Sequence, residues 1–212
     1  MNDTTTPPGS RQVAAEWWLD TARAASRTIT DAPRPDSVHS TNGGHIVLAG
    51  SARPGRPRQL LVPREQLTAL ADTDEGTWWA AHAVAAGRWP RRRGNIPALA
   101  ILLGVIGISI IFTASAGSIP FAAGLIAGTV CTALAAAMIV NNRRMAVTIA
   151  QTSDIQATRI AGIDAARSAL TGMQPHSIYK TALHQWIADH DALQPRNRLA
   201  RLECTHDVPD QA

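Results

Sequence analysis

The chain has 212 residues, a formal net charge of +4, a pI near 10.0 and a mean hydropathy of -0.05. The positive excess is mild and gathers beside one apolar segment, which argues against a dedicated nucleic-acid-binding protein. Of the two cysteines, Cys131 lies within the apolar segment and Cys204 near the C-terminus, so we expect no disulfide. The seven histidines lack the spacing of a metal site. Lysine occurs once among 20 basic residues, which, with abundant alanine, indicates a high-GC genome such as that of an actinobacterium or one of its phages.

Residues 1–10 are polar, contain two prolines and lack the apolar core of a cleavable signal peptide, so we expect a disordered tail. A helix should follow from Ser10 to about Arg27, because apolar residues recur there at helical spacing around the pair Trp17 and Trp18. This amphipathic helix could lie on a membrane surface, but its tryptophans are more typical of the core of a small domain.

Residues 30–42 are predicted to be a loop, and two short strands are predicted over 45–49 and 59–62. The turn between the strands is rich in glycine and proline and carries arginines that could contact anionic lipid or nucleic acid, although a solvated loop tip is the more ordinary interpretation. Two helices should follow, over 65–71 and 75–89, the second capped by Asp74.

The end of the second of these helices is rich in aromatic and basic residues and directly precedes the apolar segment. Rings and guanidinium groups so close to a membrane span are typical of the membrane–water interface. We therefore predict an interfacial elbow with these side chains at the level of the lipid headgroups, and packing inside a soluble domain is the alternative. The residues concerned are Trp78, Trp79, Trp89, Arg91, Arg92 and Arg93.

From Ile96 to Val140 the chain contains no charged residue. Such a run is too long for one span, and Gly117 and Pro120 interrupt it near its middle. The pattern predicts two transmembrane helices, over 96–115 and 120–140, each about 30 Å long and joined by a very short turn.

Arginines flank this hairpin at both ends, three before it and Arg143 and Arg144 after it, whereas the turn carries no charge. Because positively charged flanks stay on the cytoplasmic side, we predict a multi-pass protein of the inner (cytoplasmic) membrane with both termini in the cytoplasm. No acidic, basic or histidine side chain lies within either predicted span, which argues against a transporter.

Small residues form a stripe along the second predicted span and a shorter notch on the first. They would let another helix approach closely. Two interpretations stay open, namely homo-oligomerisation through the second helix and packing of the two helices within one hairpin. The candidate helix-packing residues are Gly104, Gly107, Gly124, Gly128, Thr132 and Ala136.

Beyond Val140 the helix can continue over 145–170 to a stop at Gly172, with Gly162 as a mild breaker. A further amphipathic helix should begin near Ser177 and end at Pro195. The remaining residues are predicted to be a short fraying helix and a tail.

The fold class that emerges is a mainly α membrane protein with a two-helix transmembrane hairpin, a small N-terminal α+β arm and a helical C-terminal arm, both cytoplasmic. Each arm alone is short for an independent hydrophobic core. The expected divisions are a disordered tail at 1–10, the N-terminal arm at 11–95, the hairpin at 96–140, the C-terminal arm at 141–195 and a tail at 196–212.

No catalytic, cofactor or metal motif stands out, so we expect neither an enzyme nor a cofactor nor a small-molecule substrate. The predicted function is a non-enzymatic membrane anchor or scaffold that contacts membrane lipids and presents its arms to a partner protein or to a second copy of itself. One alternative is a holin-like oligomer that permeabilises the membrane. The other is an accessory membrane protein of a phage or mobile element whose N-terminal arm contacts nucleic acid, the less favoured partner.

Overall fold

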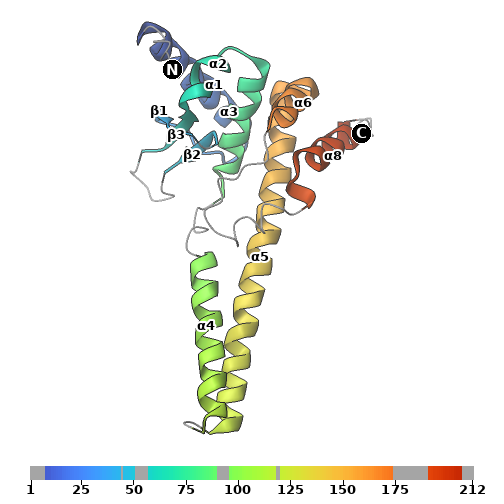
Figure 1. Cartoon of the computed structure of the whole chain (residues 1–212). Helices are drawn as coiled ribbons and strands as arrows, with labels where there is room; N and C mark the ends of the chain where they lie inside the picture. The colour runs from blue at the N-terminus through green and yellow to red at the C-terminus, as the bar shows by residue number, and fades with distance from the viewer. Residues whose placement is uncertain are drawn as a thin grey trace, which may run out of the picture. The chain divides into compact units, whose positions relative to one another are not determined.

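The structure is a computed structural model with a mainly helical chain and one small sheet (Figure 1). It divides into two compact units: unit 1 combines Met1–Pro90 with Ile149–Ala212, and unit 2 is Arg91–Thr148. The described residues are 8–43, 45–50, 57–89, 96–117, 120–173 and 191–206.

Unit 1 begins with helix α1 (Pro8–Thr28), which confirms the predicted helix and starts inside the segment expected to be a tail. Trp18 is buried, and its indole N–H donates a hydrogen bond to the carbonyl oxygen of Leu67 at 2.9 Å. Trp17 packs edge-on against Trp18 with ring centroids 5.2 Å apart. The tryptophan pair of α1 therefore belongs to a domain core.

A three-stranded sheet follows α1, with strand order β1-β3-β2. Its strands are β1 (Ser37–Thr41), β2 (Val47–Ala49) and β3 (Gln59–Pro63). The antiparallel pairing of β2 with β3 confirms the two predicted strands, whereas the loop predicted over 30–42 is wrong where β1 forms. Strand β1 is polar and pairs in parallel with the distant β3, so its sequence alone carries no alternating apolar signal.

Helix α2 (Arg64–Ala69) and helix α3 (Asp74–Ala86) come next. The N-cap of α3 is Thr73 rather than the predicted Asp74, because the Thr73 hydroxyl accepts a hydrogen bond from the backbone N–H of Gly76 at 3.0 Å. Helix α3 packs against α1, β2 and α6, so most of its residues are buried. It is the central helix of unit 1.

Unit 2 contains α4 (Ile96–Ser115) and the first part of α5 (Phe121–Ala161), which run antiparallel beside one another (Figure 1). Among the described residues, only α5 is long and apolar enough by length and composition to cross a membrane, and the apolar part of α4, Leu99–Ser115, is shorter. Helix α5 has 41 residues and so measures about 60 Å. It passes without a break from unit 2 into unit 1.

Gly162 ends α5 with φ near +90°, a backbone conformation that glycine adopts without a Cβ clash. It is therefore a full break between α5 and α6 (Ile163–Thr171), and the predicted stop at Gly172 is confirmed as the C-cap of α6. The helix predicted from Ser177 lies outside the described residues up to the 3₁₀ turn η2 (Asp191–Leu193).

The chain after η2 forms helix α8 (Pro195–His206). Pro195, which was predicted to end the preceding helix, begins α8, as proline commonly does in a first turn. The short helix predicted after Arg196 is confirmed as α8, but it is packed and not fraying, because Arg198 and Leu202 are buried. The helix is short and polar, so only its tertiary contacts distinguish it from a fraying end.

One hydrophobic core joins the two flanks of the apolar segment. The N-terminal flank contributes Trp18, Leu60 and Trp78, and the C-terminal flank contributes Leu170 and Leu202. The predicted arms at 11–95 and 141–195 thus contribute to one compact unit, which ends at Pro90 in the first arm and resumes at Ile149 in the second. The core residues of the two flanks pack in one cluster, so each flank completes the core of the other.

The packing of α8 can be tested with Leu202→Ala in the full chain. Leu202 is 4% exposed, so its truncation should lower the free energy of unfolding by about 2–5 kcal/mol. Tryptophan fluorescence during urea unfolding in detergent measures this change. The control Val13→Ala, at a side chain 67% exposed, should stay within about 0.5 kcal/mol of the parent. Equal effects of the two variants would contradict a packed α8.

Candidate functional site

A buried polar cluster joins three helices of unit 1. Arg198 of α8 donates two hydrogen bonds to the carboxylate of Asp154 in α5, Nε to Oδ2 at 2.8 Å and Nη2 to Oδ1 at 2.5 Å. His82 of α3 completes the cluster, with its Nε2 3.3 Å from Asp154 Oδ1 and 3.3 Å from Arg198 Nη2. Asp154 and Arg198 are both buried. The planar guanidinium matches the carboxylate in the two-point geometry that gives strong charge-assisted hydrogen bonds.

The electrostatics of the cluster favour an ionised Asp154. Burial raises the pKa of this carboxyl, but the hydrogen bonds and charges of Arg198 and His82 outweigh burial and hold the pKa below its ordinary value. A buried carboxylate is tolerated only when a counter-charge and hydrogen bonds replace water. The cluster therefore acts as an electrostatic clamp between the two flanks, because Asp154 and Arg198 follow the apolar segment and His82 precedes it.

Aromatic and sulfur-containing side chains enclose the clamp. The imidazole of His82 stacks on Trp78 with ring centroids 5.1 Å apart and meets the edge of Trp79 at 5.7 Å. The indole N–H of Trp78 donates to Thr158 Oγ1 at 3.2 Å, and Arg198 Nη1 lies 3.5 Å from Met173 Sδ. These contacts fix the ring of His82 against the ion pair. A carboxylate held by arginine in this way is a poor general base, so the arrangement favours a structural role.

Sequence reasoning missed this cluster. Its three members are far apart in the sequence, and Arg198 lies in the segment predicted to be a short fraying helix and a tail. One signal was available: Asp154 lies on the same helical side as Ala157, which is fully buried. An acid on the apolar side of a helix needs a partner, but the sequence does not identify the partner 44 residues away.

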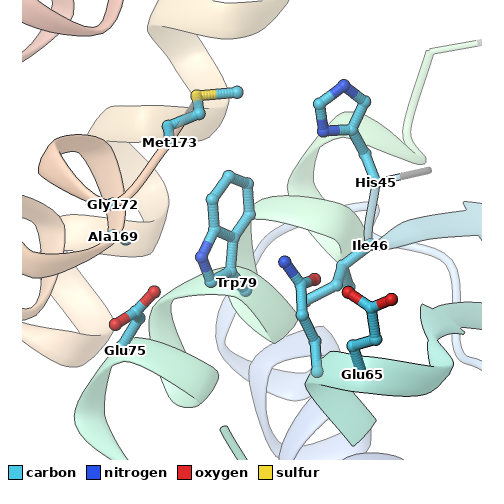
Figure 2. A pocket seen from close by; sticks show the side chains of 9 residues that line it. His45, Ile46, Glu65, Glu75, Trp79, Ala169, Gly172 and Met173 are labelled. Atoms are coloured by element: carbon cyan, nitrogen blue, oxygen red, sulfur yellow. The ribbon is translucent and has the colours of Figure 1, made fainter. Parts of the chain in front are cut away.

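A cavity of about 290 Å³ lies next to the clamp (Figure 2). Trp79, whose edge meets His82, and Met173, whose sulfur meets Arg198, belong to its wall, so the cavity and the clamp share a border. Ser168 of α6 donates a hydrogen bond to Glu75 Oε2 at 3.0 Å and so orients one acidic side chain of the wall. The lining residues are His45, Ile46, Glu65, Gln66, Glu75, Trp79, Ala169, Gly172 and Met173. Within the described parts of the chain, no group of histidine, cysteine and acidic residues is close enough to hold a metal ion.

The predicted interfacial elbow is corrected at two of its positions. Trp78 and Trp79 are buried in the core of unit 1, so their rings cannot lie among lipid headgroups. The domain-packing alternative applies to both, because α3 is covered by α1, β2 and α6. Trp89 is half-buried beyond the end of α3, and Arg91, Arg92 and Arg93 lie outside the described residues.

The predicted helix-packing residues meet within the chain. An ideal Cβ on Gly107 would lie 2.8 Å from the carbonyl oxygen of Gly128 and 2.9 Å from Thr132 Cγ2, and one on Gly128 would lie 2.7 Å from the carbonyl oxygen of Gly107. Cβ atoms do not approach other atoms this closely, so α4 and α5 depend on these glycines. Gly104 faces Ala135 at an ordinary distance of 3.8 Å.

The far end of the predicted stripe needs a correction. Gly124 is buried, but Ala136 is exposed and the buried position is Ala135. Each four-residue step along an α-helix rotates the side chain by about 40°, so a stripe of strict four-residue spacing turns away from its partner. Contact between α4 and α5 continues instead through a three-residue step. Arg143 and Arg144 follow on α5, half-buried and exposed respectively.

The surface of unit 2 is strongly apolar. Soluble proteins rarely expose apolar side chains continuously over two helices. Apart from Val13, every exposed large apolar side chain of the described residues belongs to this unit. They are Leu99, Ile101, Leu102, Val105, Ile106, Ile108, Phe112, Phe121, Leu125, Ile126, Val130, Leu134 and Val140.

No model of a known protein family, no curated protein and no solved structure matches this chain. Function therefore has to be inferred from the two features above, the apolar helix pair of unit 2 and the clamp with its neighbouring cavity in unit 1.

The role of the glycine contact can be tested with Gly128→Leu. The new side chain would overlap Ile111 and the backbone of Gly107, so the helices must separate, and we expect a stability loss of about 1–3 kcal/mol. The thermal midpoint of the helical circular dichroism signal in detergent measures this loss. Ala136→Leu, on the exposed side of α5, is the matched control and should be tolerated. An unchanged midpoint together with the loss of crosslinked dimers would indicate that Gly128 acts between chains instead.

The clamp can be tested with Asp154→Asn. This variant leaves Arg198 buried without a counter-charge, so the free energy of unfolding at neutral pH should fall by about 3–5 kcal/mol. Asp164→Asn, at an exposed acid of α6, is the control and should change the free energy of unfolding by about 0–1 kcal/mol.

Acid should weaken the clamp in the parent protein. Because the folded-state pKa of Asp154 is below the unfolded value of about 3.9, the ionised carboxylate stabilises the fold fully above about pH 5. That contribution is lost as the pH falls through the folded-state pKa. Urea unfolding between neutral and acidic pH should show this decline in the parent and in Asp164→Asn, and a shallower decline in Asp154→Asn. If the free energy of unfolding fell equally with pH in all three proteins, Asp154 would not be the group responsible.

Proposed function

We propose that the protein is a two-span membrane anchor whose flanking segments assemble one cytoplasmic domain. The observation that carries this proposal is the continuous apolar surface of unit 2, which needs lipid or other apolar groups around it. The protein then acts as a non-enzymatic scaffold that presents unit 1 at the membrane.

The polar side chains of unit 2 support a lipid environment. Ser109, Thr113 and Thr129 each donate a hydrogen bond to a carbonyl oxygen of their own helix, three or four residues earlier, at 2.7–3.1 Å. Ser115 and Thr132 do the same. Inside a bilayer no water can satisfy a hydroxyl group, so satisfaction within the helix is what a membrane span requires.

The shared core supports two crossings rather than one. The residues up to Pro90 and those from Ile149 belong to the same unit, so a membrane that unit 2 enters would have both on one side. If α5 alone crossed, the two flanks would be separated by the bilayer. Helix α4 has 20 residues and therefore a length of about 30 Å, sufficient for a second crossing.

The cytoplasmic side is assigned from charge. Arg143 and Arg144 stand on α5 directly after its uncharged part, and three arginines precede α4 in the sequence. Positive flanks remain in the cytoplasm, which would place unit 1 there. Because Gly107 and Gly128 already face one another within the chain, association with a second copy or a partner protein would use other surfaces. Nothing in the described residues favours a holin-like pore or contact with nucleic acid.

The topology can be tested with single-cysteine variants and a maleimide that does not cross membranes. Cys204 in α8 is exposed, and Ala116 at the end of α4 is exposed in the turn. With Cys131→Ala, Cys204 should react only after lysis. With Cys131→Ala, Cys204→Ala and Ala116→Cys, the introduced thiol should react in intact spheroplasts. Labelling of both positions from the same side would contradict the two-span proposal, as would release of the protein from membranes by alkaline carbonate.

A further inference from the structure

The polar strand β1 is an open edge of the sheet in unit 1. The strand order β1-β3-β2 gives β1 a single partner, β3, and leaves its other side without a strand among the described residues (Figure 1). We propose that β1 pairs in antiparallel orientation with β1 of a second copy, so that the two sheets become one continuous sheet across a two-fold axis. Every residue of this strand belongs to unit 1, so the proposal does not depend on the membrane topology.

The parallel pairing with β3 determines which backbone groups of β1 point outward. Ser37 is paired with Gln59, and its N–H donates to the carbonyl oxygen of Arg58 at 3.4 Å, so the backbone groups of Ser37 point toward β3. Because the bonding residues alternate along a strand, the N–H and C=O groups of Val38 and Ser40 point away from β3. No described residue bonds these outward groups, so only solvent or another strand can satisfy them.

The edge of β1 lacks the features with which proteins prevent pairing between sheets. Protected edges are usually very short, or carry charged residues or proline. The edge strand β2 has three residues, whereas β1 has five, none of them acidic, lysine, arginine or proline. The nearest acid in sequence, Asp36, is turned toward β3, because its carboxylate accepts a hydrogen bond from the backbone N–H of Arg58. His39 and Ser40 are exposed, so the strand is accessible.

The pattern of outward groups is self-complementary, which selects a second copy as the occupant. A two-fold axis at His39 places Val38 opposite Ser40 of the second copy, and Ser40 opposite Val38 of the second copy. The two residues of each such pair exchange N–H···O=C hydrogen bonds in both directions. No other antiparallel register pairs all the outward groups of β1. In this register Ser37 faces Thr41 of the second copy, a hydroxyl pair that is favourable across strands.

Disulfide trapping of the full chain in permeabilised cells tests the register. In a background of Cys131→Ala and Cys204→Ala, one cysteine is introduced by His39→Cys or, as the matched control one residue away, by Ser40→Cys. Cysteines at position 39 would face one another across the axis, whereas those at position 40 would be offset by roughly 7 Å along the strands, beyond disulfide reach. His39→Cys should therefore give about tenfold more disulfide-linked dimer than Ser40→Cys.

Two results of the trapping would overturn the proposal. One is equal dimer yield at positions 39 and 40, or no dimer at position 39. The other is a disulfide between position 39 and a different protein, which would show that β1 takes a strand from a partner instead of from a second copy.

A charge exchange at His39 separates pairing from folding. Two copies with different affinity tags are expressed together, and their co-purification in mild detergent measures association. His39→Glu in both copies, or His39→Lys in both, should lower co-purification by about fivefold, because like charges directly opposite destabilise a strand pair. Gln12→Glu in both copies, at an exposed position of α1, is the control and should associate as the parent does.

The mixed pair is decisive. His39→Glu in one copy together with His39→Lys in the other should restore co-purification to the parent level, because opposite charges then face one another across the axis. A folding defect cannot produce this restoration, and only two copies that meet at this position can show it. Continued loss of co-purification in the mixed pair would overturn the proposal.

Discussion

The ion pair between Asp154 and Arg198 is the interaction on which the arrangement of unit 1 depends. It lies where three helices from both flanks of the apolar segment meet, and His82 ties the N-terminal flank to it. A buried ion pair adds little stability over well-packed apolar residues, but a broken one is costly. The clamp therefore penalises every arrangement in which α8 or the end of α5 is displaced. We interpret it as a device for specificity in a core otherwise made of alanines, branched aliphatic side chains and tryptophans.

Apolar packing and the clamp both hold the two flanks together. Trp18, Trp78 and Leu60 are the largest fully buried side chains of the core, and the alanines of α5 and α6 allow these helices to approach it closely. Small residues have the same role in unit 2, where Gly107 and Gly128 let the backbones of α4 and α5 come into contact. In both units small residues determine how close the helices lie, and large residues determine which side faces inward.

Local patterns in the sequence predicted those elements whose own residues carry a regular signal. Helix α1 carries such a period, the strands β2 and β3 are short apolar runs between turn residues, and the helices on either side of Gly117 come from one long uncharged segment. Elements defined by distant partners were missed or only partly predicted. Strand β1 is polar and was missed, because its pairing with β3 defines it. Helix α8 was predicted only as a short fraying helix, because its packing depends on Asp154 and the core. In the same way, spacing showed that Gly128 faces a helix, but only the structure identified that helix as α4. Of the candidate site, sequence reasoning found the aromatic residues and missed the charges that they enclose.

The discontinuity of unit 1 has a consequence for biosynthesis. A ribosome releases α1, the sheet and α3 before the apolar segment, and synthesis of Arg91–Thr148 then takes about 3 to 12 s before the first residues of the second flank appear. During that interval Trp18 and Trp78 have an incomplete core and Arg198 does not yet exist. If the two helices span the membrane as proposed, only a chain inserted with both flanks on one side can complete the domain. A chain inserted once leaves two halves that cannot fold, open to proteases on either side. Completion of the domain would then serve as a proofreading step for membrane insertion.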